Sequence, residues 1–167
     1  LPIREDGLFG QAELTSCGLN GGPLAGEGYY PSCIACHLFT DRPVIYVGDS
    51  DKPEYVNGSF PKIVKEGWDG DQNEGYITNM YDQCTAGFRY FDLSHVSEIT
   101  LTIRGYAYGS MEIRTSFEGS AVKTIPLHYS NIWRDIKTEI KLPEGADSLY
   151  FTYRGPGSAS FKGFTLK

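Results

Sequence analysis

The stretch that decides the fold is "SEITLTIRGY", residues 97–106. Within it Ile99, Leu101 and Ile103 are separated by single polar residues, so that apolar side chains recur at every second position. Successive side chains of a β-strand point to opposite faces of the sheet. The stretch therefore predicts a strand with one face buried in a core and the other turned toward water.

Three later stretches repeat this period of two, at residues 110–117, 131–142 and 147–155. Gly- and Pro-containing turns separate the stretches about every eight to twelve residues, a spacing typical of a sandwich or barrel. We find no segment with the period of a helix of three turns, and we predict an all-β fold of two packed antiparallel sheets. The residues expected to point inward are Met111, Ile113, Ile132, Ile136, Ile140, Leu142, Leu149, Phe151 and Tyr153.

Residues 17–73 have a different composition, rich in Gly and Pro, which predicts a long loop region. Two strands are expected within it, one through "SCIACHLF" (32–39) and one through "RPVIYV" (42–47). No linker interrupts the chain. We therefore expect residues 1–167 to form a single domain.

The charge and hydropathy of the chain limit its partners. It has 167 residues and a net charge of −6, and its 15 Lys and Arg residues are scattered. This disfavours a nucleic-acid partner. No apolar run reaches the roughly 18 residues that span a bilayer, so we expect a soluble protein without a membrane partner. Because the chain begins without Met, we expect a piece of a longer polypeptide.

The four cysteines are Cys17, Cys33, Cys36 and Cys84. Cys33, Cys36 and His37 have the C-x-x-C-H spacing of a c-type haem site. The strand-like, apolar surroundings instead favour a buried strand, with Cys33 and Cys36 on opposite faces of it. Disulfides and buried free thiols both remain open, as does the pairing, whereas a single close pair disfavours structural zinc.

Two large aromatic residues are predicted to lie on the solvent-facing side of their strands, where such side chains are uncommon. Trp133 is out of phase with Ile132 and Ile136, and Tyr76 with Ile77, so both rings are expected to face water. One interpretation is that a local loop covers them. The other is a stacking surface for sugar rings, whose C–H faces pack on aromatic rings. Trp68, within a polar loop, is a weaker candidate for the same role.

An acidic loop precedes Tyr76, with Asp69, Asp71 and Asn73 at alternate positions as in a calcium loop. Met80 and Glu74 replace the Glu and Gly that such a loop requires, so a solvated turn is the competing interpretation. No G-x-S-x-G or H-E-x-x-H motif is present. Nothing in the sequence points to an enzyme.

Several motifs follow one another along the chain: "GQAEL" (10–14), "CGLNGGPL" (17–24), "YPSCIAC" (30–36), "GYITNM" (75–80), "AGFRYFD" (86–92), "LTIRG" (101–105), "SLYFTYRG" (148–155) and "SASFKGFTL" (158–166). Their order resembles a family 6 carbohydrate-binding module, of the type appended to family 43 glycoside hydrolases. That resemblance implies a jelly-roll β-sandwich without catalysis, in which Tyr76 and Trp133 clasp a sugar ring. Ser160 stands where the family has an Asn that hydrogen-bonds the sugar.

The family's structural calcium usually takes two acidic residues from the first strand and an Asp from the last. Here the corresponding residues are Gln11, Glu13 and Lys162. We therefore expect this metal site to be lost, Lys162 to pair with Glu13, and no cofactor to be required.

The resemblance implies binding of xylan or arabinoxylan, as oligosaccharides or chain ends, which targets a linked catalytic domain to its substrate. A plant cell-wall ligand favours a secreted parent enzyme. The alternative is a structural accessory domain that packs on the catalytic domain of a family 43-like xylosidase or arabinofuranosidase and binds no sugar itself.

Overall fold

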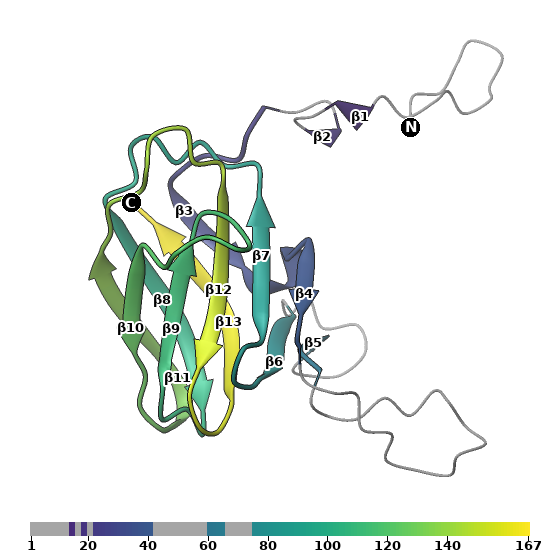
Figure 1. The fold of residues 1–167 in the computed structure, drawn as a ribbon, viewed down its shortest axis with the longest axis vertical. Helices are drawn as coiled ribbons and strands as arrows, with labels where there is room; N and C mark the ends of the chain where they lie inside the picture. The colour runs from purple at the N-terminus through teal and green to yellow at the C-terminus, as the bar shows by residue number, and fades with distance from the viewer. Residues whose placement is uncertain (1–13, 16–17, 20–21, 42–59, 66–74) are drawn as a thin grey trace, which may run out of the picture.

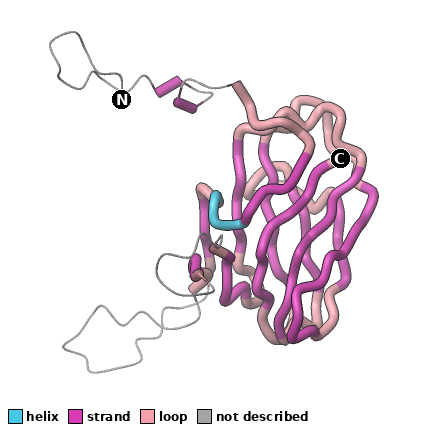
Figure 2. Tube along the Cα trace, turned by 180° about the vertical axis from the view of Figure 1, so that it is seen from behind, coloured by secondary structure: helices cyan, strands magenta, loops and turns pink. Residues whose placement is uncertain are grey.

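The computed structural model describes residues 14–15, 18–19, 22–41, 60–65 and 75–167. These residues form two stacked antiparallel sheets (Figure 1), which confirms the predicted all-β sandwich. Within this part of the chain the single helical segment is the one-turn 3-10 helix Ser32–Ile34 (Figure 2), so no helix is long enough to span a membrane.

One sheet has six strands, in the order β11-β8-β13-β6-β5, with β3 paired to β13 beyond the end of β6. The other has five, in the order β10-β9-β12-β7-β4, and a short pair, β1 and β2, stands apart from both. The bounds of the strands are β1 Leu14–Thr15, β2 Gly18–Leu19, β3 Gly28–Pro31, β4 His37–Phe39, β5 Lys62–Val64, β6 Tyr76–Met80, β7 Thr85–Arg89, β8 Glu98–Gly105, β9 Ser110–Arg114, β10 Lys123–Pro126, β11 Ser130–Glu139, β12 Ser148–Arg154 and β13 Ala159–Leu166.

The core lies between the two sheets and follows the predicted alternation. Ile99, Leu101 and Ile103 of the opening stretch are buried, and the residues between them line the outer face of the six-stranded sheet. Burying these side chains contributes about 1.5–3 kcal/mol each. The predictions are also confirmed for Met111, Ile113, Ile140, Leu149, Phe151 and Tyr153.

The prediction for Ile132 is wrong, because this side chain is 60% exposed. Pairing of β11 with β8 shifts between Ser130, opposite Gly105, and Arg134, opposite Ile103, so that four steps along β11 match two along β8. The Ser130 hydroxyl fixes this bulge by donating to the Ile132 carbonyl at 2.6 Å. A bulge interrupts the period of two, and Ile132 leaves the core face.

The predicted strand through residues 32–39 is shorter than expected. Ser32–Ile34 is the 3-10 turn and only His37–Phe39 pairs, as β4 with β7. Cys33 is half-buried and Cys36 exposed, and both are free thiols, so the two do not lie on opposite faces of a buried strand. Cys84 is buried in the core. The strand predicted over 42–47 and Cys17 lie outside the described residues.

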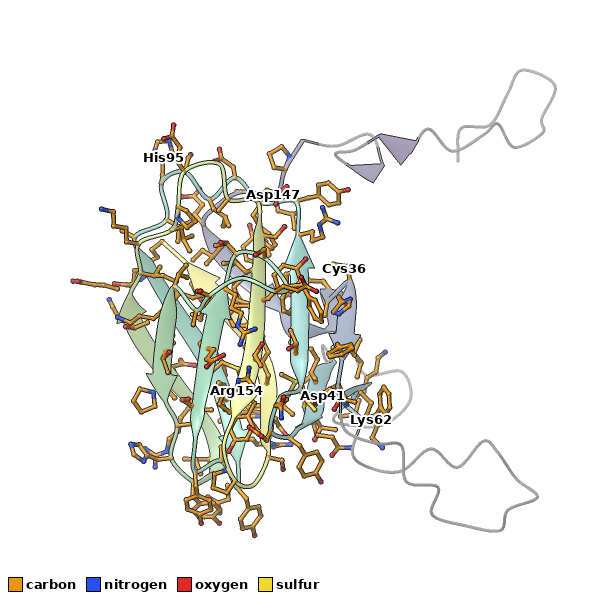
Figure 3. The ribbon with its side chains drawn as sticks, in the orientation of Figure 1. Cys36, Asp41, Lys62, His95, Asp147 and Arg154 are labelled. Carbon is orange, nitrogen blue, oxygen red and sulfur yellow. The ribbon has the colours of Figure 1, made fainter. Side chains whose placement is uncertain are left out.

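The loops β8–β9, β10–β11 and β12–β13 gather at one end of the sandwich, the lower end in Figure 1. Arg154 lies toward this end, whereas His95 and Asp147 lie at the other (Figure 3). The loop β12–β13 contains a glycine in very close contact with the loop β8–β9: a Cβ on Gly157 would stand 1.7 Å from the Tyr106 carbonyl oxygen. Glycine is required there because the two backbones touch.

Candidate functional site

The candidate site lies on the outer face of the six-stranded sheet. Arg104 on β8 is opposite Ser160 on β13, and Thr102 of β8 is opposite Asp135 of the neighbouring β11. Tyr76 opens β6, the strand on the other side of β13. Four adjacent strands, each from a different part of the sequence, therefore place their outward side chains on one patch.

The structure brings Tyr76 and Trp133 into contact. Their ring centroids are 5.1 Å apart and the rings are inclined at 77°, an edge-to-face arrangement. Arg104 joins them: its guanidinium carbon lies 4.2 Å from the centroid of Trp133 and 5.1 Å from that of Tyr76. Its Nη2 also donates a 3.1 Å hydrogen bond to the Tyr76 hydroxyl. The three side chains form one packed cluster.

This cluster is not an open clamp for a sugar. A ring held between two others needs carbon–carbon contact of about 3.5–4 Å on each side, which separates the outer rings by about 7–8 Å. Tyr76 and Trp133 are closer than that, and Arg104 occupies the space against Trp133. To stack on this cluster, a sugar ring would have to pack on the outer side of the pair or displace the guanidinium.

Polar groups border the aromatic pair. The Ser160 hydroxyl forms a 3.0 Å hydrogen bond with the Thr78 hydroxyl, two residues along β6 from Tyr76. The Lys162 ammonium lies 5.7 Å from the centroid of Trp133, within the range of a cation–π interaction. Ser160 thus lies on the same outer face as the two aromatic residues that the resemblance assigns with it.

Several predicted residues cannot be placed. Trp68, Asp69, Asp71 and Asn73 lie outside the described residues, as does Glu13, the predicted partner of Lys162. In the part of the chain that is described, no group of three or more His, Cys, Asp and Glu side chains is arranged to hold a metal ion.

Sequence reasoning missed Arg104 and Thr78. The signal for Arg104 was present in the opening stretch, where it alternates with Ile103 and thus faces outward. Its position opposite Ser160 depends on how β8 and β13 are aligned, which the local pattern does not encode.

Comparison with solved structures identifies the fold. A family 6 carbohydrate-binding module from Clostridium stercorarium, solved with cellobiose, matches 88% of this chain and 98% of its own with a TM-score of 0.65 and 11% identity. The chain has the fold of a family 6 carbohydrate-binding module. A second such module, from Clostridium cellulolyticum in complex with xylose, matches 86% of this chain and 98% of its own with a TM-score of 0.62 and 12% identity.

The chain also resembles parts of two larger proteins. A family 43 arabinoxylan arabinofuranohydrolase from Bacillus subtilis, solved with cellotetraose, matches 99% of this chain and 32% of its own chain, with a TM-score of 0.64 and 15% identity. A xylosidase/arabinosidase from Thermoclostridium stercorarium is 46% identical over 166 residues, which is 99% of this chain and 35% of that relative. The chain therefore spans about a third of the length of the curated relative that it matches. No family model matches the sequence.

The structural matches and the sequence match agree with the predicted resemblance to family 6 modules of the type that accompany family 43 enzymes.

Proposed function

We propose that this chain is a non-catalytic module that binds xylan or arabinoxylan, as oligosaccharides or chain ends, and holds a linked glycoside hydrolase on its substrate. The proposed site consists of Tyr76 and Trp133 as the stacking surface and Ser160 as a hydrogen-bonding group, with Trp68 as a further aromatic contact. A tether of this kind raises the local concentration of substrate around the catalytic domain.

The observation that supports the proposal is the packing contact between the rings of Tyr76 and Trp133. These residues come from distant parts of the sequence, yet their rings pack together on a half-exposed face beside the Ser160–Thr78 hydroxyl pair. Aromatic faces beside hydroxyl groups match the chemistry of a sugar, which has apolar C–H faces and a polar rim. The 46% identity to a xylosidase/arabinosidase supports a ligand from the xylan class.

The proposal predicts that Trp133→Ala abolishes measurable binding. Removing an aromatic residue from the centre of a small site costs about 2 kcal/mol or more, or about 30-fold in affinity. Calorimetry with xylotetraose and affinity electrophoresis in arabinoxylan measure the loss. Trp133→Phe, which keeps a stacking face, is the matched control and should retain part of the affinity. Equal affinity of the wild type and Trp133→Ala would exclude this site.

One observation favours the second candidate, a structural domain without a sugar site of its own. Arg104 packs against both aromatic rings, so the cluster is filled by protein groups. In that case the module stabilises its catalytic partner.

Deleting the module from the parent enzyme distinguishes the targeting role from the structural role. If the module targets the enzyme, its deletion should lower the activity on insoluble arabinoxylan and leave the activity on chromogenic glycosides unchanged. If the module is structural, its deletion should lower the melting temperature of the enzyme and its activity on both substrates.

A further inference from the structure

Three large aromatic side chains are exposed at the lower end of the sandwich. Tyr106 and Tyr108 in the β8–β9 loop are 66% and 61% exposed, and Tyr129 in the β10–β11 loop is 45% exposed. The rings of Tyr106 and Tyr129 lie 5.0 Å apart at 38°, and those of Tyr108 and Tyr129 lie 6.4 Å apart and nearly parallel, at 12°. We call Tyr106, Tyr108 and Tyr129 the tyrosine platform.

The backbone beneath the platform is fixed. Ala107, between the two tyrosines of the β8–β9 loop, is 1% exposed and forms a β-bridge with Gly157. The Ser158 amide donates to the Tyr106 carbonyl at 3.2 Å. Because residues on either side of a buried position in an extended segment point away from the core, Tyr106 and Tyr108 are both held outward.

A buried tyrosine, Tyr153, holds the β8–β9 loop in place through hydrogen bonds of its hydroxyl. The Tyr108 amide donates to the Tyr153 hydroxyl at 3.2 Å, and that hydroxyl donates to the Pro156 carbonyl at 2.5 Å. Tyr153 itself is fully buried in the core. The loop that presents the platform is thus anchored to the sandwich, and little conformational entropy remains to be lost when a ligand binds.

A hollow with polar groups lies beside the platform. It has a volume of about 450 Å³ and is lined by Tyr81, Asp82, Gln83, Gly155, Pro156 and Gly157. The Tyr108 ring borders it, since a Cβ built on Gly157 would lie 3.7 Å from a Tyr108 ring carbon. Apolar ring faces therefore stand next to carboxylate, amide and backbone groups that can take up hydroxyl hydrogen bonds.

We propose that the tyrosine platform is a second carbohydrate contact, on which a further part of the same polysaccharide chain stacks while its hydroxyls enter the adjacent hollow. The inference rests on the proposed function, because it takes the ligand to be a polysaccharide. Continuity with the first site supports this occupant. Tyr129 directly precedes β11, which bears Trp133, and Tyr106 directly follows Gly105, the partner of Ser130 at the start of β11.

The area of the platform argues against a protein partner. At about 200 Å² for each tyrosine side chain, the three exposures leave roughly 350 Å² in contact with water. A stable protein interface buries about 800 Å² on each partner. A patch of less than half this size, built from separate rings with hydroxyl rims, fits a chain of sugar rings.

The test uses the 167-residue chain and a set of surface variants. These are Tyr106→Ala/Tyr108→Ala, Tyr129→Ala, the corresponding Phe variants and Trp133→Ala. Ile132→Ala is the matched control, because Ile132 is a 60% exposed apolar side chain that lies between Tyr129 and Trp133 in the sequence. Affinity electrophoresis in soluble arabinoxylan, xylan and β-glucan reports binding of long chains. Calorimetry with xylobiose reports the site at Trp133 alone, and thermal unfolding confirms the fold of each variant.

We expect the Ala variants of the platform to weaken polysaccharide binding about 3- to 10-fold while xylobiose binding is unchanged. The Phe variants and Ile132→Ala should bind as the wild type does, and Trp133→Ala should lose both ligands. Unchanged polysaccharide binding in the platform variants, with loss in Trp133→Ala, overturns the platform and leaves the proposed function standing. Loss in the platform variants alone supports the platform and excludes the site at Trp133.

Two other results overturn the inference. If none of the three polysaccharides retards the wild-type chain in electrophoresis, neither the tyrosine platform nor the site at Trp133 binds these polysaccharides. A wild-type dimer in sedimentation that dissociates in Tyr106→Ala/Tyr108→Ala makes the platform an interface between copies of the chain.

Discussion

Arg104 packs against both rings of the aromatic pair in the proposed site. Its guanidinium packs on Trp133 and hydrogen-bonds the Tyr76 hydroxyl, so one flexible side chain covers the surface that a sugar ring would use. A cation on an aromatic face at a partly exposed position contributes about 0.5–1 kcal/mol. A ligand that stacks on Trp133 in place of the guanidinium has to offset the loss of this contribution.

Arg104→Ala is therefore expected to raise the affinity for neutral xylooligosaccharides about 2- to 5-fold, because the competing contact is gone. Calorimetry with xylotetraose measures the change, and Arg104→Lys, which keeps the charge but not the planar stacking group, should give a smaller increase. A fall in affinity for Arg104→Ala would mean that the guanidinium contacts the sugar.

At the scale of elements, Ser32 joins strands that are far apart in the sequence. Its hydroxyl donates to the Phe161 carbonyl at 2.5 Å and accepts from the Ile77 amide at 3.0 Å, and the residue is fully buried. Phe161 and Ile77 are register partners where pairing of β13 with β6 shifts. A side-chain hydroxyl thus satisfies backbone groups that the irregular ladder leaves open.

Ser32→Ala should lower the free energy of unfolding by about 1–3 kcal/mol, because two buried backbone groups lose their partner. Urea denaturation followed by tryptophan fluorescence measures the change. Ser97→Ala, which removes a hydroxyl with a 3.5 Å exposed contact, is the control and should change stability little. A stability equal to that of the wild type would show that water replaces the hydroxyl.

The outer face of the five-stranded sheet contains a charged cluster. Glu112 on β9 accepts hydrogen bonds from Arg114 and, at 3.2 Å, from Arg154 on the neighbouring β12. Burial raises the pKa of the Glu112 carboxyl, but the two arginines lower it more, so that the pKa lies below its ordinary value. The folded state therefore favours the ionised carboxylate.

A lowered folded-state pKa adds stability above the unfolded pKa of about 4.3, and this stability is lost as the pH falls through the folded value. We expect Glu112→Gln to lower the free energy of unfolding by about 1 kcal/mol at pH 7. The difference from the wild type should shrink below about pH 4. Urea unfolding at pH 7 and pH 3 checks this, and a constant difference at both would contradict the assignment.

At the scale of the whole molecule, two sheets with a shared aromatic core supply the stability. Phe88, Phe151, Phe161 and Phe164 contact one another across the sandwich, with ring centroids 5.0–6.3 Å apart. Such contacts contribute beyond the burial of apolar area.

We predict that calcium does not contribute to this stability. A metal that binds only the folded state stabilises it by RT ln(1 + [L]/Kd), so a bound ion would show in the melting temperature. Thermal unfolding in EDTA and in millimolar calcium should give the same midpoint. A higher midpoint in calcium would contradict this prediction, because it would show that the folded chain binds the ion.

The sequence by itself determined the class of fold and most of the core. Ile99, Leu101 and Ile103 could be assigned correctly because a period of two is a local property of a strand. The outward phase of Tyr76 and Trp133 could be predicted for the same reason. Ile132 could not, because the bulge at Ser130 belongs to the pairing of two strands and not to either one.

Only the tertiary structure decided which side chains contact one another on the surface. The contact of Tyr76 with Trp133, the insertion of Arg104 and the gathering of the tyrosine platform depend on the register of β6, β13, β8 and β11 and on loops that end at the same edge. Register joins residues distant in sequence, and no local periodicity encodes it.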